Sequence, residues 1–449
     1  MVVRRVESPS SPNASDILSE SLTFPTAELV AKNRFYKAPL TERVSTWDPE
    51  QPEKNGIPTK GLFNLYKKWS HGGFGLISTG NVMVCPKHLE AAGNAIIHES
   101  IDSTERREAF KQVAEAIKSG GALAICQLSH DGRQTPFNIN PKPLSSSDKQ
   151  LMDVRNGSRF GKPTPMTKEQ IHDVVQSFAY AAKYCYDAGF NGVLLPIAHN
   201  KLLAQFVSPV TNNRTDEYGG SVENRIRIIF DIYDAIRSAI PVDGQFIVGM
   251  KLNSVEFHGE GMSTEDIGYV ADRFEKAGID YIELTGGNVE HSAPYVRDST
   301  RKREAFFLEF AQEVKKRLSK TVVYITGGYR TAYWMAKTVS DEFTDGIGLG
   351  RPAASEPDLP LKILTNKADA AIDSQLDQFD FGLTVTAGIT QMHQAGLTPF
   401  CGKNFMEGIM DLSDSEVADK YKKAHGEFVV KDTEISLSGG IPYGVLESF

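Results

Sequence analysis

Short apolar runs alternate with longer amphipathic segments along most of this 449-residue chain. The apolar runs have the length of buried strands, and the segments between them place apolar residues at helical spacing, as in 105–117. This alternation is typical of parallel α/β architecture. The predicted strands are Arg34–Pro39, Phe74–Thr79, Ala122–Leu128, Asn191–Leu195, Phe246–Lys251, Tyr281–Leu284, Val322–Ile325 and Gly346–Gly350.

Eight consecutive βα units predict a (β/α)8 barrel, or TIM barrel, over residues 24–367. A doubly wound open sheet is the alternative. It is disfavoured because no predicted strand is followed by a GxGxxG turn with an acidic residue further on. A capping-box pattern at Thr167 and Gln170 predicts the start of a helix that runs to Ala188.

Three segments do not follow the βα alternation. Residues 1–23 have no apolar periodicity and are predicted to form a disordered N-terminal arm. Residues 131–166 are rich in Pro, Ser and Asn, which predicts a long loop excursion over the barrel mouth. Residues 368–449 are predicted to form a C-terminal extension packed on the barrel, with a helical pattern near 413–423.

The composition, with 40% hydrophobic and 24% charged residues and a net charge of -8, is that of a soluble globular protein. The acidic balance argues against nucleic acid as a partner, and no apolar run has the ~20 residues of a membrane span. We expect a cytoplasmic protein with a small-molecule substrate and no metal, and a homo-oligomer is left open. The cysteines, which lack metal-type spacing and are expected to be reduced, are Cys85, Cys126, Cys185 and Cys401.

One stretch, residues 191–227, carries most of the recognisable chemistry. An apolar strand is followed by Pro196 and then by His199, Asn200 and Lys201, and the chain continues through LLAQF to RTDEYGGSVENR. Polar side chains in such a βα loop are where α/β barrels build active sites. The LLAQF and RTDEYGGSVENR motifs closely resemble the Old Yellow Enzyme family of FMN-dependent ene-reductases. The resemblance implies a TIM barrel that binds FMN and uses NAD(P)H.

The resemblance also implies residues that contact the flavin ring. Pro39, Leu40 and Thr41 match the first flavin-contacting turn of the family, where Thr41 would bond near flavin O4. Without the resemblance, Thr41 is an ordinary turn residue. Gln127, in QLSHDGR, ends the third strand, and its amide suits the pyrimidine edge of the flavin.

A cation at the end of the fifth strand would complete the ring contacts. Lys251 stands where the family has an Arg or Lys near flavin N1 and O2, and it would stabilise negative charge there. The alternative is a barrel lysine paired with a carboxylate such as Glu283. The two interpretations are compatible.

The last two strands are predicted to supply the phosphate site. Gly327 and Gly328 follow the seventh strand, and Gly350 and Arg351 close the eighth. Loops after these strands hold phosphate in many such barrels, through backbone N–H groups and a helix N-terminus. Arg351 would add a bidentate cation.

The substrate-binding motif departs from the family pattern. The family reads approximately H-x-x-H/N-G-Y here, whereas this chain has Pro196 for the first His, His199 for the second and Lys201 for the Tyr. One of the two donors that polarise the substrate carbonyl is therefore missing, along with a ligand for nicotinamide. Desolvation would lower the pKa of Lys201 and make it a general acid or base, unless the side chain has turned to solvent.

These features support three functional hypotheses. The first is reduction of the C=C bond of an α,β-unsaturated carbonyl compound with NAD(P)H, in which His199 and Lys201 are catalytic. The second is an FMN-binding isomerase, dehydratase or cyclase that acts on a secondary metabolite through the same two residues. The third is a degenerate flavin-binding scaffold, which Gln127, Lys251 and Arg351 argue against.

Overall fold

The computed structural model describes residues 3–152, 154–155, 158–241, 245–253, 262–285, 311–378 and 380–447. Eight parallel strands close into a barrel because β3 pairs with β15 on one side and with β4 on the other. The TIM-barrel prediction is confirmed. The barrel strands are β3 (Phe35–Lys37), β4 (Leu76–Met83), β6 (Leu123–Ser129), β11 (Gly192–Ile197), β12 (Ile247–Asn253), β13 (Tyr281–Thr285), β14 (Val322–Thr326) and β15 (Gly346–Leu349).

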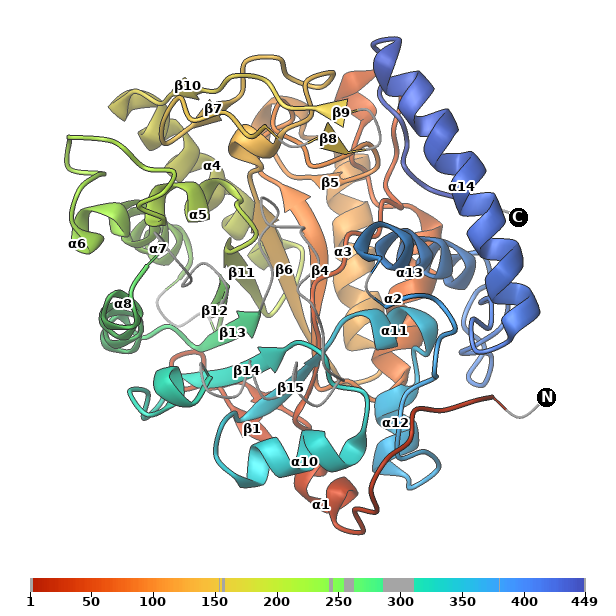
Figure 1. Cartoon of the computed structure of the whole chain (residues 1–449). Helices are drawn as coiled ribbons and strands as arrows, with labels where there is room; N and C mark the ends of the chain where they lie inside the picture. Colours follow the sequence, from red (N-terminus) through yellow and green to blue (C-terminus); the bar gives the residue numbers. More distant parts are fainter. Residues whose placement is uncertain are drawn as a thin grey trace.

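Helices surround these strands (Figure 1). The helix predicted from the capping box is α4, where Thr167 Oγ1 accepts the Gln170 N–H and the Gln170 side chain accepts the Thr167 N–H. The longer barrel helices are α2 (Lys60–His71), α3 (Thr104–Lys118), α4 (Lys168–Asp187), α7 (Arg227–Ala239), α8 (Thr264–Ala277) and α10 (Ala332–Ser340). Shorter elements are η1 (Pro52–Lys54), β5 (Ala95–Ile96), η2 (Glu99–Ile101), α5 (Leu202–Val207), α6 (Val222–Arg225), α11 (Arg351–Ser355) and α12 (Leu359–Leu364).

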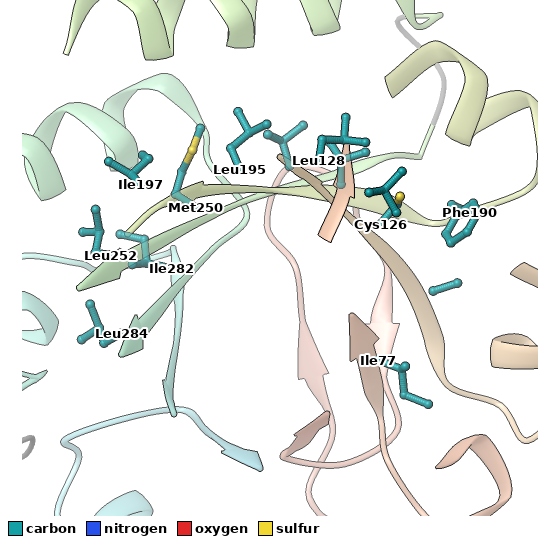
Figure 2. Packing of buried hydrophobic residues seen from close by; sticks show 14 of the residues in the cluster. Ile77, Cys126, Leu128, Phe190, Leu195, Ile197, Met250, Leu252, Ile282 and Leu284 are labelled. Carbon is teal, nitrogen blue, oxygen red and sulfur yellow. The ribbon is translucent and has the colours of Figure 1, made fainter. Parts of the chain in front are cut away.

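Successive side chains of each strand point to opposite sides, toward the helices or into the barrel. Leu195, Met250 and Ile282 belong to the outer apolar layer that the helices cover (Figure 2). Leu194 and Ile247 belong to a separate cluster that fills the lower barrel interior. The alternation therefore directs every second residue toward the interior, including those at the C-terminal ends of the strands.

A small hairpin packs into the end of the barrel at which the strands begin. Strands β1 (Leu22–Thr23) and β2 (Val30–Ala31) pair antiparallel, and Phe24 between them is buried in the inner cluster. Asp280 fixes the hairpin, because its Oδ1 accepts the backbone N–H groups of Thr26 and Ala27. The barrel interior is thus closed below, and the opposite end carries the candidate site.

The N-terminal arm differs from the predicted disordered segment. It contains a helix, α1 (Ala14–Ser19), and Arg5 lies in a β-bridge with Ile372. The Arg5 guanidinium donates to both carboxylate oxygens of Glu356, at 2.9 and 2.7 Å, and to the Ala370 carbonyl at 2.6 Å. A buried carboxylate such as Glu356 requires a cation, and this long-range requirement leaves no periodic signal in the sequence.

Strand β11 also differs from the prediction, which ended it before Pro196. The strand continues to Ile197, and Pro196 aligns with Lys251 of β12. On its other side, β6 pairs with β11 only from Gly192 to Leu194. Pro196 therefore has a ladder partner on one side only, which is where a residue without an N–H is tolerated.

The excursion at 131–166 forms several short elements that run across the top of the view in Figure 1. One pair, β7 and β10, is parallel, and another, β8 and β9, is antiparallel. The sequence also predicts that residues 288–300, together with this excursion, shape the substrate pocket, and residues 288–300 lie outside the described residues. The elements of the excursion are η3 (Gly132–Gln134), β7 (Leu144–Ser145), β8 (Val154–Arg155), β9 (Ser158–Arg159) and β10 (Thr164–Pro165).

The C-terminal extension carries two long helices, α13 (Phe381–Gly396) and α14 (Ser415–Leu437). Helix α13 lies against α2 and α11 of the barrel. Helix α14 is outermost in Figure 1 and packs on α13 through a cluster that includes Leu383 and Tyr421. Among the helices in the described ranges, none combines the length and the apolar character needed to cross a membrane.

Gly249 of β12 provides a test of the interior packing. A Cβ at this position would lie 2.2 Å from Cε1 of the buried Tyr281 ring. We expect Gly249→Ala to lower the free energy of unfolding by about 1–3 kcal/mol through overpacking, as measured by urea denaturation. The control, Gly426→Ala on α14, has nothing within 4 Å of the added Cβ and should raise it by about 0.5–1 kcal/mol. Equal stability of the two variants would contradict this packing.

Candidate active site

Three residues that the sequence places at strand ends face the barrel mouth together. Gln127 lies in the interior-facing row of β6 and Lys251 in that of β12, and Pro196 ends the interior-facing row of β11. Gln127 aligns with Leu194, and Pro196 aligns with Lys251 in the next strand pair. Because all these strands are parallel, their C-terminal ends lie at the same end of the barrel.

Gln127 has an unused acceptor. Its Nε2 donates to Asn81 Oδ1 at 2.7 Å, which fixes the orientation of the amide. Its Oε1 is buried and has no hydrogen-bond partner among the described residues. An unpaired buried carbonyl is unfavourable by about 1–3 kcal/mol, so the position suits a ligand that donates an N–H. The N3–H of a flavin pyrimidine ring is such a donor, and this residue therefore fits FMN.

Lys251 is paired as one of the two interpretations expects. Its Nζ lies 3.1 Å from Glu283 Oε1 on the neighbouring strand β13, and the two residues are aligned in register. Glu283 is fully buried, and the Tyr36 hydroxyl donates to its Oε2 at 3.1 Å. The lysine is thus held at the mouth by a carboxylate below it, and its charge is partly compensated before any ligand arrives.

The turn after β3 lies close to the predicted phosphate loops, but the hydroxyl of Thr41 does not point to the partner expected from the sequence. Pro39 and Leu40 are half-buried, and a Cβ on Gly350 would lie 3.5 Å from Leu40 Cδ2. The Thr41 hydroxyl donates to Glu90 Oε2 at 2.8 Å. A hydroxyl has one hydrogen, so in this arrangement Thr41 cannot donate to flavin O4. It can only accept, which corrects the role expected from the sequence.

Lys201 is neither neutral nor turned to solvent. Its side chain is 9% exposed, and its Nζ donates to Asp131 Oδ1 and lies 3.4 Å from Glu90 Oε1. Burial acts to lower the pKa of this ammonium, but the two carboxylates outweigh that effect and raise the pKa above its ordinary value. The expected lowering of the Lys201 pKa toward neutrality is therefore wrong, because Asp131 and Glu90 lie beside the ammonium and favour its charged form.

Glu90 connects the lysine to the flavin-side residues. It accepts from Thr41 and from Asn81 Nδ2, the latter at 2.8 Å. Burial acts to raise its pKa, but Lys201, Arg43 and these hydrogen bonds together lower it to about 2. Since Asn81 also holds Gln127, an unbroken chain of contacts links Lys201 to the predicted pyrimidine contact.

Sequence reasoning missed Asp131, Glu90 and Asn81. Asp131 follows His130 in QLSHDGR, and this motif ends a predicted strand beside the site, so it could have been found. Glu90 lies in a loop after β4 with no periodic or motif signal. Only the fold brings Glu90 and Lys201 together across more than a hundred residues of sequence.

His199 lies in a tight turn between β11 and α5. Both His199 and Asn200 have left-handed backbones, with φ of 54° and 55°. Such conformations are unfavourable outside glycine and persist where the surroundings impose them. The Gln134 side chain donates to the His199 carbonyl at 2.5 Å, and Gln205 donates to the Asn200 carbonyl at 2.6 Å. The backbone at the half-buried His199 is thus fixed from two sides, by Gln134 of η3 and by Gln205 of α5.

The two predicted phosphate loops face one cleft. Gly328 and Arg351 both line it. Gly327 precedes Gly328, whose φ of +77° requires glycine, and Gly350 precedes Arg351. The Arg351 guanidinium donates from Nη1 to Thr384 Oγ1 at 3.0 Å. The structure therefore brings these residues to the same end of the barrel as Leu40.

A cluster of Cys85, His88 and His130 has the composition of a metal site, with its ligand atoms within 4.8 Å of one another. His88 Nε2 accepts the Leu144 N–H at 2.9 Å, and its Nδ1 lies 3.2 Å from Cys85 Sγ. Burial lowers the pKa of His88 to about 4, so the ring is neutral and the hydrogen is assigned to Nδ1. A histidine that binds a metal through one ring nitrogen usually donates the N–H of its other ring nitrogen to an acceptor. In His88 the other nitrogen, Nε2, faces the Leu144 N–H, which is a donor. The cluster therefore fits hydrogen bonding and ring stacking.

Comparison with known proteins gives consistent matches. A model of the NADH:flavin oxidoreductase / NADH oxidase family matches residues 23–370. NADH-dependent flavin oxidoreductase nadA of Aspergillus parasiticus is 40% identical over 383 residues, which cover 84% of this chain and 85% of that protein. NADH-dependent flavin oxidoreductase iccE of Talaromyces variabilis is 32% identical over 371 residues, covering 78% and 86%.

Solved structures show the same fold. An Old Yellow Enzyme homologue from Zymomonas mobilis superposes with a TM-score of 0.67 at 22% identity, over 88% of this chain and 99% of that one. Morphinone reductase in complex with tetrahydroNAD superposes with a TM-score of 0.64 at 23% identity, over 79% and 92%. At this level of identity, the likeness concerns the barrel itself.

The buried cation at Lys201 leads to a stability prediction. Lys201→Ala would leave Asp131 and Glu90 without their shared ammonium, and we expect it to lower the free energy of unfolding by about 3–5 kcal/mol at neutral pH. The stabilisation from the lowered pKa of Glu90 is complete above its unfolded value and is lost as pH falls toward about 2. In the variant, protonation of Asp131 and Glu90 relieves their mutual repulsion. The difference in the free energy of unfolding between variant and wild type should therefore shrink at acidic pH, as measured by urea denaturation.

The matched control is Lys422→Ala, which removes an exposed lysine from a surface pair with Asp419. Its stability should equal that of wild type at every pH, because exposed ion pairs contribute little. A Lys201→Ala variant that behaves like this control would show that the three charges are not coupled.

Proposed function

Because the chain belongs to the NADH:flavin oxidoreductase / NADH oxidase family, which is the Old Yellow Enzyme family of FMN-dependent oxidoreductases, we propose that it reduces the C=C bond of an α,β-unsaturated carbonyl compound. The observation that carries this proposal is the fixed ammonium of Lys201 in the same βα loop as His199. Both side chains can hold the oxygen of a carbonyl substrate. Bound FMN would supply the hydride-transfer chemistry that connects NADH with the substrate.

The cofactor is held in this proposal by the strand-end residues. Gln127 would accept from the pyrimidine edge with its Oε1, which has no hydrogen-bond partner among the described residues. Lys251 would provide positive charge near N1 and O2, limited by its pair with Glu283. Gly327, Gly328, Gly350 and Arg351 would hold the phosphate end, and Pro39, Leu40 and Thr41 would border the ring.

Lys201 acts as a fixed cation in this mechanism. Two of its three N–H groups are directed to Asp131 and Glu90, and an ammonium has one more to offer. That group can share the substrate oxygen with His199 and stabilise the negative charge that develops there. With its pKa raised, Lys201 is a poor proton donor near neutral pH, so we assign the proton that returns to carbon to water.

A second candidate function keeps the FMN without net redox turnover. Pro196 supports it, because this residue cannot provide the second donor that would hold an enone or a nicotinamide carboxamide. In this case His199 would move protons in an isomerisation, dehydration or cyclisation of a secondary metabolite. A base role for Lys201 is disfavoured, because the raised pKa keeps it protonated.

Anaerobic reduction of the bound flavin distinguishes the two candidates. We expect excess NADH to bleach the visible flavin absorbance of the purified holoprotein within seconds, and NADPH to do so more slowly, because the relatives named above are NADH-dependent. The measurement is stopped-flow absorbance. A flavin that stays oxidised for minutes with either nucleotide would favour the non-redox candidate.

The missing donor can be restored at Pro196, which aligns with Lys251 at the mouth. We expect Pro196→His to raise kcat/KM for a simple enone such as 2-cyclohexenone, toward the ~10²-fold that one such donor contributes. Pro196→Ala is the matched control, because it removes the proline without adding a donor. Equal activities of the two variants would mean that position 196 does not reach the substrate.

A further inference from the structure

The cleft at the phosphate end of the barrel has a wall that is not part of the barrel. Gly328, Arg330 and Arg351 form its inner side, and the cleft encloses about 950 Å³, including space open to solvent. Its outer side comes from residues beyond 370, where the match to the family model ends. These outer residues include Ser374, Gln378, Thr384, Gln391, Met410 and Leu412.

The inner and outer sides are joined at Arg351. Thr384 lies in the first turn of α13, and its Oγ1 accepts an N–H from Arg351 Nη1 at 3.0 Å. Its own hydrogen is donated to the Asp380 carbonyl at 2.9 Å. The hydroxyl therefore presents a lone pair to the guanidinium in a fixed direction. Thr384 is itself 4% exposed and Arg351 is half-buried, so the threonine side of the contact is shielded from water.

The charges around the cleft favour an anion. Arg330 and Arg351 place two cations on its inner side. Among the described residues that line the cleft, Asp373 on the outer side is acidic, and it pairs with Arg4 at 2.8 Å. The N-terminal arm completes this wall, since Val6 lines the cleft and its N–H donates to the Ala371 carbonyl.

We propose that the C-terminal extension is part of the cofactor site: Thr384 on α13 positions the Arg351 guanidinium against the phosphate of FMN, and the extension with the N-terminal arm closes the phosphate end. This inference rests on the proposed function, because it takes Arg351 as the phosphate ligand. Thr384 is a positioning residue that acts through Arg351. The extension thereby sets how tightly FMN is retained and leaves the chemistry at His199 unchanged.

The test compares the affinities of variant holoproteins for FMN and for riboflavin, which has the same ring without the phosphate. We expect Thr384→Val to raise the FMN dissociation constant about tenfold, the size of one hydrogen bond to a charged group, and to leave riboflavin affinity unchanged. Thr384→Ser keeps the hydroxyl and should restore wild-type FMN affinity. Flavin fluorescence on release and rebinding measures both constants.

The matched control is Thr433→Val on α14, which removes a threonine hydroxyl with the same intrahelical bond, to the Val429 carbonyl, away from the cleft. It should bind FMN like wild type. If Thr384→Val also binds FMN like wild type, or loses riboflavin affinity equally, the role of the extension is overturned.

A second variant separates this outcome from a failure of the cofactor assignment. We expect Arg351→Ala to lose FMN affinity by about 10²-fold, the effect of losing a bidentate charged contact. If Arg351→Ala retained FMN fully, the phosphate assignment itself would be wrong. If Arg351→Ala binds FMN weakly while Thr384→Val binds it like wild type, the phosphate assignment stands and only the role of the extension is rejected.

Discussion

The mouth of this barrel depends on the compensation of buried charge. Removing an ion from water costs several kcal/mol even after relaxation, and only a well-placed opposite charge offsets it. Lys201 is held by Asp131 and Glu90, and Lys251 is held by Glu283. These pairs fix the side chains around the site before any ligand binds, and they decide which protonation states are available for chemistry.

The fold was largely predictable from the sequence because barrel strands are buried on both sides and appear as short apolar runs. The strand ends were less predictable: β11 continues through Pro196, which has only one ladder partner there. The arm was mispredicted because an ion pair between Arg5 and Glu356 links residues far apart in the sequence. Neither feature has a local periodicity that a sequence can display.

The candidate site was predictable as a set of positions but less so as chemistry. Gln127 and Lys251 lie near the strand ends that the motif and the apolar pattern indicate. The Gln127 carbonyl has no hydrogen-bond partner among the described residues, and Lys251 pairs with the carboxylate of Glu283. The protonation state of Lys201 could not be predicted from the sequence, since Glu90 reaches it from a loop without a motif. The family resemblance indicated where the catalytic tyrosine is replaced, and the structure shows the environment in which the replacement lies.

The cleft at the phosphate end is walled by Val6, Arg351 and Leu412, which come from the beginning and the late part of the chain. During synthesis, the barrel strands and their apolar core leave the ribosome well before residue 412. The cleft is therefore complete only after the outer wall has been synthesised. Under the proposed role of the extension, tight retention of the cofactor would begin at that late stage, after the barrel strands have been made.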